Sequence, residues 1–189
     1  MTQQSSFAIG RRGVLAAGIG ALAFAIPARA QIETRLILQR GMSGGGLAQL
    51  EGSDDPRLAN FGLFASSLQL PEGKTLVLGA IQWLEAGSDL QLQSIEVVSC
   101  IPIPERSDGA QVRGRMQVNG EGDYPFLIRA YDGGRPGSAL DRIEIAVNTP
   151  EALDGAASQP SDTEFTYEAT GILVAGDLQW VISDIDVSD

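Results

Sequence analysis

Apolar and polar residues alternate with a period of two along most of this 189-residue chain. This alternation is typical of β-strands with one buried face, and the 3.6-residue period of an amphipathic helix is hard to find over any long window. The predicted strands are 34–40, 58–66, 75–84, 91–99, 111–119, 124–131, 142–148, 164–170 and 172–182.

Turn-rich segments separate these strands, among them SGGG at 43–46 and DGGRPG at 132–137. About eight or nine short strands divided in this way predict an all-β fold, an antiparallel β-sandwich, with a partly open β-barrel as the alternative. Residues 149–163 are poor in large apolar side chains and predict a mobile loop within a single domain over 31–189.

The strands on either side of DGGRPG predict a hairpin with a defined register. Pairing Ala130 with Ile143, Ile128 with Ile145 and Phe126 with Val147 places these six apolar residues on one face. The same register places Arg129 opposite Glu144 on the outer face, where opposite charges contribute about 0.2–1 kcal/mol.

The first thirty residues have the pattern of an export signal. They contain no Asp or Glu, and an apolar run follows Arg11 and Arg12. Ala28 and Ala30 form a small-x-small cleavage site, which predicts a signal peptide at 1–30. The apolar run is shorter than the roughly twenty residues that span a bilayer.

The arginine pair is similar to the twin-arginine translocation motif, because one variable and two apolar residues follow it in RRGVL. A mildly apolar, Gly- and Ala-rich run and Arg29 near the cleavage site agree with that route. An ordinary secretory signal is the alternative. We therefore expect the translocation machinery as a partner and a periplasmic or extracellular location.

The net charge of the chain after removal of residues 1–30 limits the kinds of partner that we expect. Cleavage removes three of the 13 basic residues and none of the 24 acids, which leaves a net charge of 10 − 24 = −14. Such a charge argues against nucleic acid or an anionic membrane surface as a partner. No further stretch of the sequence is apolar enough to predict a membrane span.

Cysteine and histidine usage excludes several chemistries. Cys100 is the single cysteine and the chain has no histidine. A catalytic triad with His, a zinc site of the usual ligands, haem bound by His and an iron–sulfur cluster are therefore excluded. We expect Cys100 to be a buried, inert thiol and the protein to need no cofactor.

Calcium is the one metal with candidate ligands. Asp132, Asp141, Glu121 and Asp123 flank the hairpin strands, and calcium requires six to eight oxygens. Their spacing fits no EF-hand loop. The glycines and Pro136 of DGGRPG are explained more simply by a turn, so these four residues stay weak calcium candidates.

The hairpin region resembles the post-COAP domain family of bacterial extracellular proteins. The matching features are Gly114, Val118-Asn119-Gly120, Tyr124, Phe126, Tyr131-Asp132-Gly133, Pro136-Gly137, Asp141, Ile143 and Ile145, with weaker similarity from about 41 to 187. The resemblance implies a secreted β domain, often beside adhesive or repeat modules, without an established activity.

These observations predict an exported, non-catalytic binding or structural domain of the cell envelope or extracellular space. The alternatives are a cofactor-free hydrolase that uses two carboxylates, and a calcium-dependent adhesion domain. By alternation Trp83 and Trp180 face the core, which argues against a sugar-stacking platform.

Overall fold

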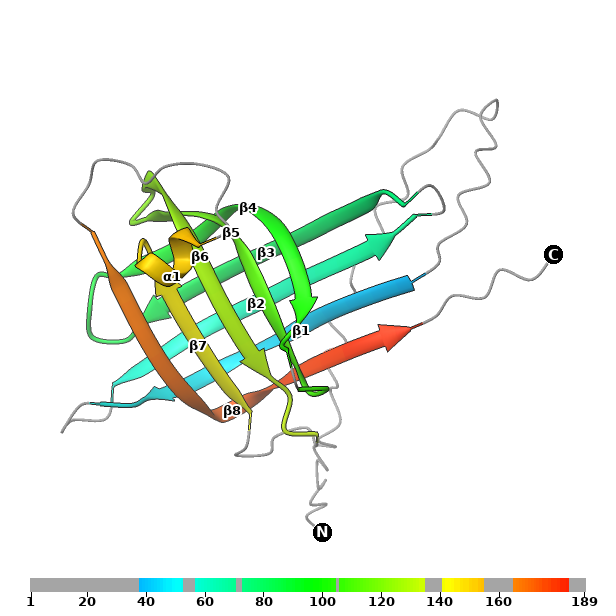
Figure 1. Ribbon diagram of the computed structural model, residues 1–189. Helices are drawn as coiled ribbons and strands as arrows, with labels where there is room; N and C mark the ends of the chain where they lie inside the picture. The colour runs from blue at the N-terminus through cyan, green and yellow to red at the C-terminus, as the bar shows by residue number, and fades with distance from the viewer. Residues whose placement is uncertain are drawn as a thin grey trace, which may run out of the picture. The chain divides into compact units, whose positions relative to one another are not determined.

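The computed structural model describes residues 38–52, 57–70, 73–104, 106–134, 141–154 and 165–183 (Figure 1). All of them belong to one compact unit, Thr34–Asp189. The export signal with Arg11, Arg12, Ala28 and Ala30 lies outside the described residues. The described part of the chain contains no helix long and apolar enough to cross a membrane.

Eight antiparallel strands form a closed barrel in simple chain order, with the last strand paired to the first. The all-β prediction is confirmed, and so is the barrel alternative, whereas the sandwich is not observed. The elements are β1 Leu38–Leu50, β2 Leu58–Gln69, β3 Thr75–Glu85, β4 Gln91–Pro102, β5 Gly109–Val118, β6 Glu121–Tyr131, β7 Arg142–Val147, α1 Pro150–Leu153 and β8 Tyr167–Ser183.

The barrel is built from two crossing layers that share two bent strands (Figure 1). The first part of β8 pairs with β7 in the front layer, and the part after Gly171 pairs with β1 in the back layer. β4 makes the other corner, where its register with β5 shifts twice. Bulges and bends of this kind let one strand serve two layers.

The two predicted strands 164–170 and 172–182 are therefore one strand, β8. Alternation along the chain is the same in a sandwich and in a barrel, because both bury one face of every strand. It does not reveal whether the first and last strands pair. That pairing, from Gln39–Ser183 to Leu50–Gly171, is what makes this fold a barrel.

The hairpin register predicted from the sequence is confirmed. Ala130 pairs with Ile143, Ile128 with Ile145, and Arg129 with Glu144 in the β6–β7 ladder. The Arg129 guanidinium lies 3.5 Å from the Glu144 carboxylate. The six apolar residues of this face are buried inside the barrel.

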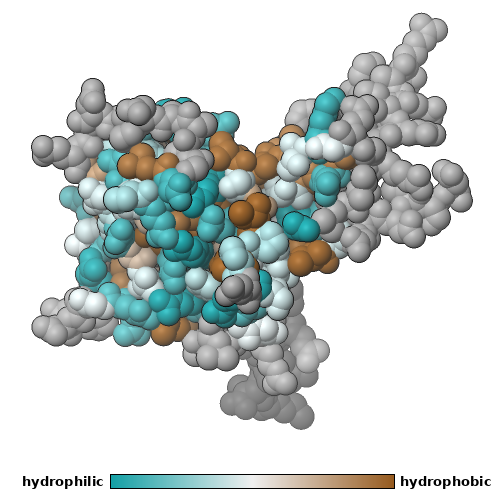
Figure 2. Space-filling view, viewed as in Figure 1, coloured by the Kyte–Doolittle hydropathy of each residue, from teal (hydrophilic) through white to brown (hydrophobic). Residues whose placement is uncertain are grey.

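Side chains fill the interior of the barrel. The largest of its fully buried side chains are Trp83, Phe126, Met42, Ile81, Leu92, Met116, Ile128, Ile143, Ile145, Leu178 and Val112. Each contributes about 1.5–3 kcal/mol by leaving water. Figure 2 shows mostly hydrophilic side chains over the front layer, and hydrophobic ones gathered where the front layer ends and the back layer continues.

The turn predicted at SGGG is wrong, because residues 43–46 lie in the middle of β1. Their glycines allow β8 to approach β1 closely. A Cβ on Gly46 would lie closer than 3.0 Å to the backbone of Ala175 and Gly176. Gly176, with φ at +103°, would meet the backbone of Gly45 and Gly46 in the same way. The glycines therefore belong to a strand-to-strand contact and not to a loop.

The segment predicted as a loop over 149–163 begins with a helical turn, α1. The Thr149 hydroxyl caps it by accepting from the Ala152 amide at 3.1 Å. Ala152 packs on Leu127 and Ala146, which form a small cluster on the outer face of the barrel. Residues 155–163 lie outside the described residues.

The contact between β1 and β8 predicts a steric penalty at Gly176. Gly176→Ala should lower the free energy of unfolding by about 2–4 kcal/mol, because the methyl group meets the β1 backbone and the φ angle is strained. Urea unfolding followed by circular dichroism measures the change.

Gly62→Ala is the matched control, because a Cβ at Gly62 meets nothing within 4 Å. This variant should be neutral or slightly stabilised. Equal stabilities of the two variants would contradict the close approach of β1 and β8.

Candidate functional site

Asp132 and Asp141 hold the β6–β7 loop against β8. The buried Asp141 carboxylate, which is 0 % exposed, accepts from the Gly133 amide and from the Leu178 amide, each at 2.8 Å. The Asp132 carboxylate accepts from the Gly134 amide at 2.7 Å and from the Trp180 amide at 2.9 Å. All four carboxylate oxygens therefore accept backbone N–H groups.

These bonds cover a strand edge. Leu178 and Trp180 lie in the part of β8 beyond the β7 ladder, which ends at Ile172. Their amide groups point away from β1 and would need water or another chain as an acceptor. The two aspartates supply that acceptor, which is one of the ways proteins protect an exposed strand edge.

The structure does not bring the four calcium candidates together. Glu121 and Asp123 lie at the start of β6, and Asp132 and Asp141 follow its end. Nine residues of extended chain separate Asp123 from Asp132, about 30 Å. Asp123 is bound to Arg115 instead. Among the described residues, no group of three or more acidic or cysteine side chains is placed to hold a metal ion.

A second polar network closes the opposite end of the barrel. The Glu85 carboxylate, only 5 % exposed, accepts from Arg57 at 2.8 Å and from the Tyr167 hydroxyl at 3.0 Å. The Trp83 indole N–H donates to that hydroxyl at 3.1 Å. Burial, reinforced by the nearby carboxylate, raises the pKa of Tyr167 well above its ordinary value.

Sequence reasoning missed this network, although alternation contains the signal. Glu85 is two residues beyond Trp83 and four beyond Ile81, so it faces the same side of β3. An acid at an inward position requires donors nearby. Arg57 and Tyr167 come from distant segments, and only the closed barrel brings them to Glu85.

Cys100 and the two buried acids, Glu85 and Asp141, have structural roles. The Cys100 thiol donates to the Ala65 carbonyl at 3.6 Å, and burial raises its pKa to about 11. Cys100 is therefore protonated at neutral pH and is a poor nucleophile. The buried acids Glu85 and Asp141 lie at opposite ends of the barrel, so they form no carboxylate pair.

The two tryptophans differ in burial. Trp83 is buried and stacks near Phe61, with ring centroids 6.1 Å apart, as predicted. Trp180 is half-buried, which corrects the prediction that it lies wholly in the core. Ile182 on the same face is 54 % exposed, because this end of β8 extends beyond the front layer.

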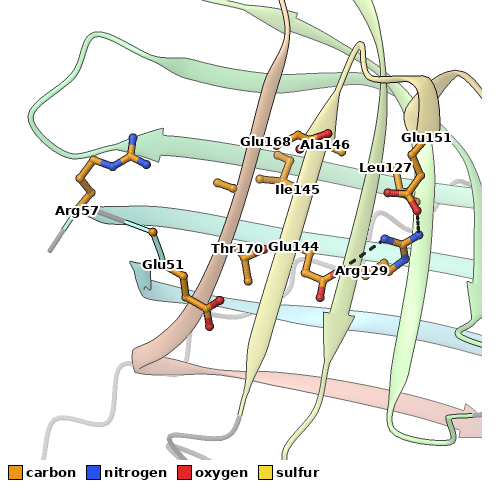
Figure 3. Close-up of a pocket in the computed structure, with 12 residues that line it drawn as sticks. Glu51, Arg57, Leu127, Arg129, Glu144, Ile145, Ala146, Glu151, Glu168 and Thr170 are labelled. Atoms are coloured by element: carbon orange, nitrogen blue, oxygen red, sulfur yellow. Dashed lines mark hydrogen bonds and ion pairs between the residues drawn. The ribbon is translucent and has the colours of Figure 1, made fainter. Parts of the chain in front are cut away.

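A groove with a volume of about 450 Å³ lies on the outer surface (Figure 3). We call it the charged groove. It crosses the outer faces of β6, β7 and β8 between α1 and the end of β1. Its lining residues are Glu51, Gly52, Arg57, Leu127, Arg129, Glu144, Ile145, Ala146, Glu151, Glu168, Ala169 and Thr170.

Arg129 is the centre of charge in the groove. It forms ion pairs with Glu144 from β7 and with Glu151 from α1 (Figure 3). The pKa of Glu151 is lowered by its hydrogen bond from Arg129, so this carboxylate stays ionised at mildly acidic pH. Arg113 donates to the carbonyls of Glu151 and Asp154, which holds α1 at the rim.

Acids outnumber bases along the groove. Its lining holds four glutamates and two arginines. Both arginines already have carboxylate partners, since Arg57 pairs with Glu85. Glu168 forms no ion pair with any other described residue. Arg142, which does not line the groove, forms ion pairs with Glu51 at 3.9 Å and with Glu144 at 3.3 Å. Glu168 is therefore the groove glutamate whose charge is left unpaired among the described residues.

Comparison of the chain with protein-family models, with curated proteins and with solved structures finds no match. The resemblance to the post-COAP domain family stays a prediction.

The Asp141 contacts predict a large stability effect. Asp141→Asn replaces one acceptor oxygen by an N–H donor that faces a backbone N–H group. We expect the free energy of unfolding to fall by about 2–4 kcal/mol, since bonds to a charged, buried group are among the strongest. Chemical denaturation with urea measures this loss.

Asp89→Asn in the exposed turn after β3 is the control, and it should change stability by less than about 0.5 kcal/mol. An Asp141→Asn protein as stable as the control would mean that Asp141 does not anchor β8.

Proposed function

We propose that this protein is an exported, non-catalytic binding or structural domain of the cell envelope or extracellular space, and that it acts through its outer surface. The observation that carries the proposal is the filled interior. Barrels of eight strands have room either for their own side chains or for one small ligand. Here Trp83, Phe126, Met42 and Met116 occupy that room, and the charged groove lies outside it.

Export and location rest on the sequence. The signal pattern at 1–30 supports passage through the twin-arginine route, and the acidic mature chain suits a soluble partner in the periplasm or outside the cell. A single buried cysteine is compatible with an oxidising compartment, because it offers no exposed thiol to cross-link.

The non-catalytic part of the proposal rests on the state of the reactive groups. Glu85, Asp132 and Asp141 are each hydrogen-bonded to structural donors, and the Cys100 thiol is protonated. A carboxylate-dependent hydrolase requires two acids within about 5–10 Å in an open site. The buried acids are at opposite ends of the barrel. In the open groove, Glu144 and Glu151 bind the same Arg129, and the hydrogen bond from Arg129 lowers the pKa of Glu151, which makes Glu151 a poor proton donor.

The charged groove is the surface that we propose for ligand binding. Its excess of glutamates suits a cationic group, such as a lysine- or arginine-rich segment of an envelope protein. On the outer face of the floor, Ala146 and the methyl group of Thr170 offer a small apolar contact to the methylene stems of such side chains, whereas the side chains of Ile145 and Ala169 face the barrel interior. The ion pairs of Arg129 keep the glutamates of the rim in place.

A labelled pentalysine peptide is the probe for this groove. We expect saturable binding that weakens as salt is added, because salt screens surface charge. Glu51→Gln combined with Glu168→Gln should reduce the affinity about three- to tenfold, since each exposed charge contributes up to about 1 kcal/mol. Fluorescence anisotropy measures the affinity.

The control is a second double variant that makes the same change in net charge outside the charged groove. Asp89→Asn combined with Glu96→Gln removes two exposed acids that do not line the groove. It should retain nearly the wild-type affinity. An equal loss in both double variants would show attraction by net charge alone and would overturn the groove as the binding surface.

A further inference from the structure

The back layer of the barrel has two edges, and the described part of the chain covers only one of them. Beyond the corners, β8 forms one edge of this layer and the first half of β3 forms the other (Figure 1). An unpaired strand edge presents backbone donors and acceptors that recruit another strand. The two edges therefore require separate explanations.

The β8 edge is covered by the chain itself. Asp132 and Asp141 accept the amides of Trp180 and Leu178, and the Asp141 carbonyl accepts the Leu173 amide at 3.0 Å. Two charged side chains also stand beside this edge. It is thus closed to a further strand.

The β3 edge has no such cover within the described part of the chain. The β3–β4 ladder consists of the three pairs from Gln82–Gln93 to Leu84–Gln91. The Ser94 hydroxyl then accepts the Ile81 amide at 2.8 Å. From Thr75 to Ala80, the ladder partner of β3 is β2 alone, because β4 bends away into the front layer.

The side chains of this edge favour pairing. The stretch TLVLGA at 75–80 contains no charge and no proline, the residues that commonly block edge strands. Leu76 and Leu78 point outward and are 45 % and 49 % exposed. Phe64, on β2 beside Ala80, is also half exposed on the same face.

We propose that the β3 edge binds the β3 edge of a second copy of this chain, as an antiparallel pair about a twofold axis at Leu78. This register places Leu78 opposite its own copy and Leu76 opposite Ala80 of the copy. The two back layers then form one continuous sheet, and an apolar row runs from Phe64 through Ala80 across the junction. A twofold interface uses the same patch on both partners.

A second copy can approach this edge without the charge repulsion that it meets over the rest of the surface. The whole chain carries a net charge of −11, so two copies repel one another over most of their surfaces. Residues 75–80 are uncharged, and the antiparallel register aligns no like charges. The edge also lies apart from the charged groove, so this proposal is independent of the ligand that the groove binds.

The test is the molar mass in solution of the exported protein, purified from a host that exports it. Light scattering after size exclusion should give a dimer for the wild type at micromolar concentration. Leu78→Lys should give a monomer with an unchanged circular dichroism spectrum, because the new charge would meet its own copy.

Val181→Lys is the matched control, since Val181 is 47 % exposed on the outer face but lies on the edge that the aspartates cover. It should remain a dimer. As a second readout, Leu78→Cys should form a disulfide-linked dimer, with Cys100 buried and protonated. A monomeric wild type over the whole concentration range, or a Leu78→Lys variant that stays dimeric, would overturn the proposal.

Discussion

The close approach of β8 to β1 is the constraint on which the rest of the structure depends. β8 can leave the front layer and reach β1 only because Gly46 and Gly176 have no side chains at the crossing. That pairing closes the barrel and encloses Trp83, Phe126 and their neighbours. Without it, the same strands would form an open sheet with its apolar face in water.

Closure also determines where the polar groups lie. At one end it brings Arg57 and Tyr167 to the buried Glu85, and at the other it brings Asp132 and Asp141 to the amides of β8. Two of the four calcium candidates, Asp132 and Asp141, thereby hold the β6–β7 loop against β8. The charged groove lies on the outer surface, over β6–β8.

The alternation of apolar and polar residues predicted most of the strands. It did not predict that the first and last strands pair and close the barrel. The β6–β7 register was predictable because two adjacent strands must share one buried face. The strand at the middle of β1 was not predictable, because SGGG has the composition of a turn. Its role becomes clear only when β8, over a hundred residues later, is seen to lie against it. Likewise the distance between Glu121 and Asp132 depends on β6 being a straight strand, and Glu85 finds its partners only in the closed barrel.

The most direct test of barrel closure is a designed disulfide between β1 and β8. Ser43 and Gln179 are paired across this junction, and Cys100 is buried and does not compete. The double variant Ser43→Cys and Gln179→Cys should form an intrachain disulfide in the folded protein, measured by mass spectrometry, whereas Ser43→Cys with Gln93→Cys on β4 should not. Two free thiols in the first variant would contradict a barrel closed by β1 and β8.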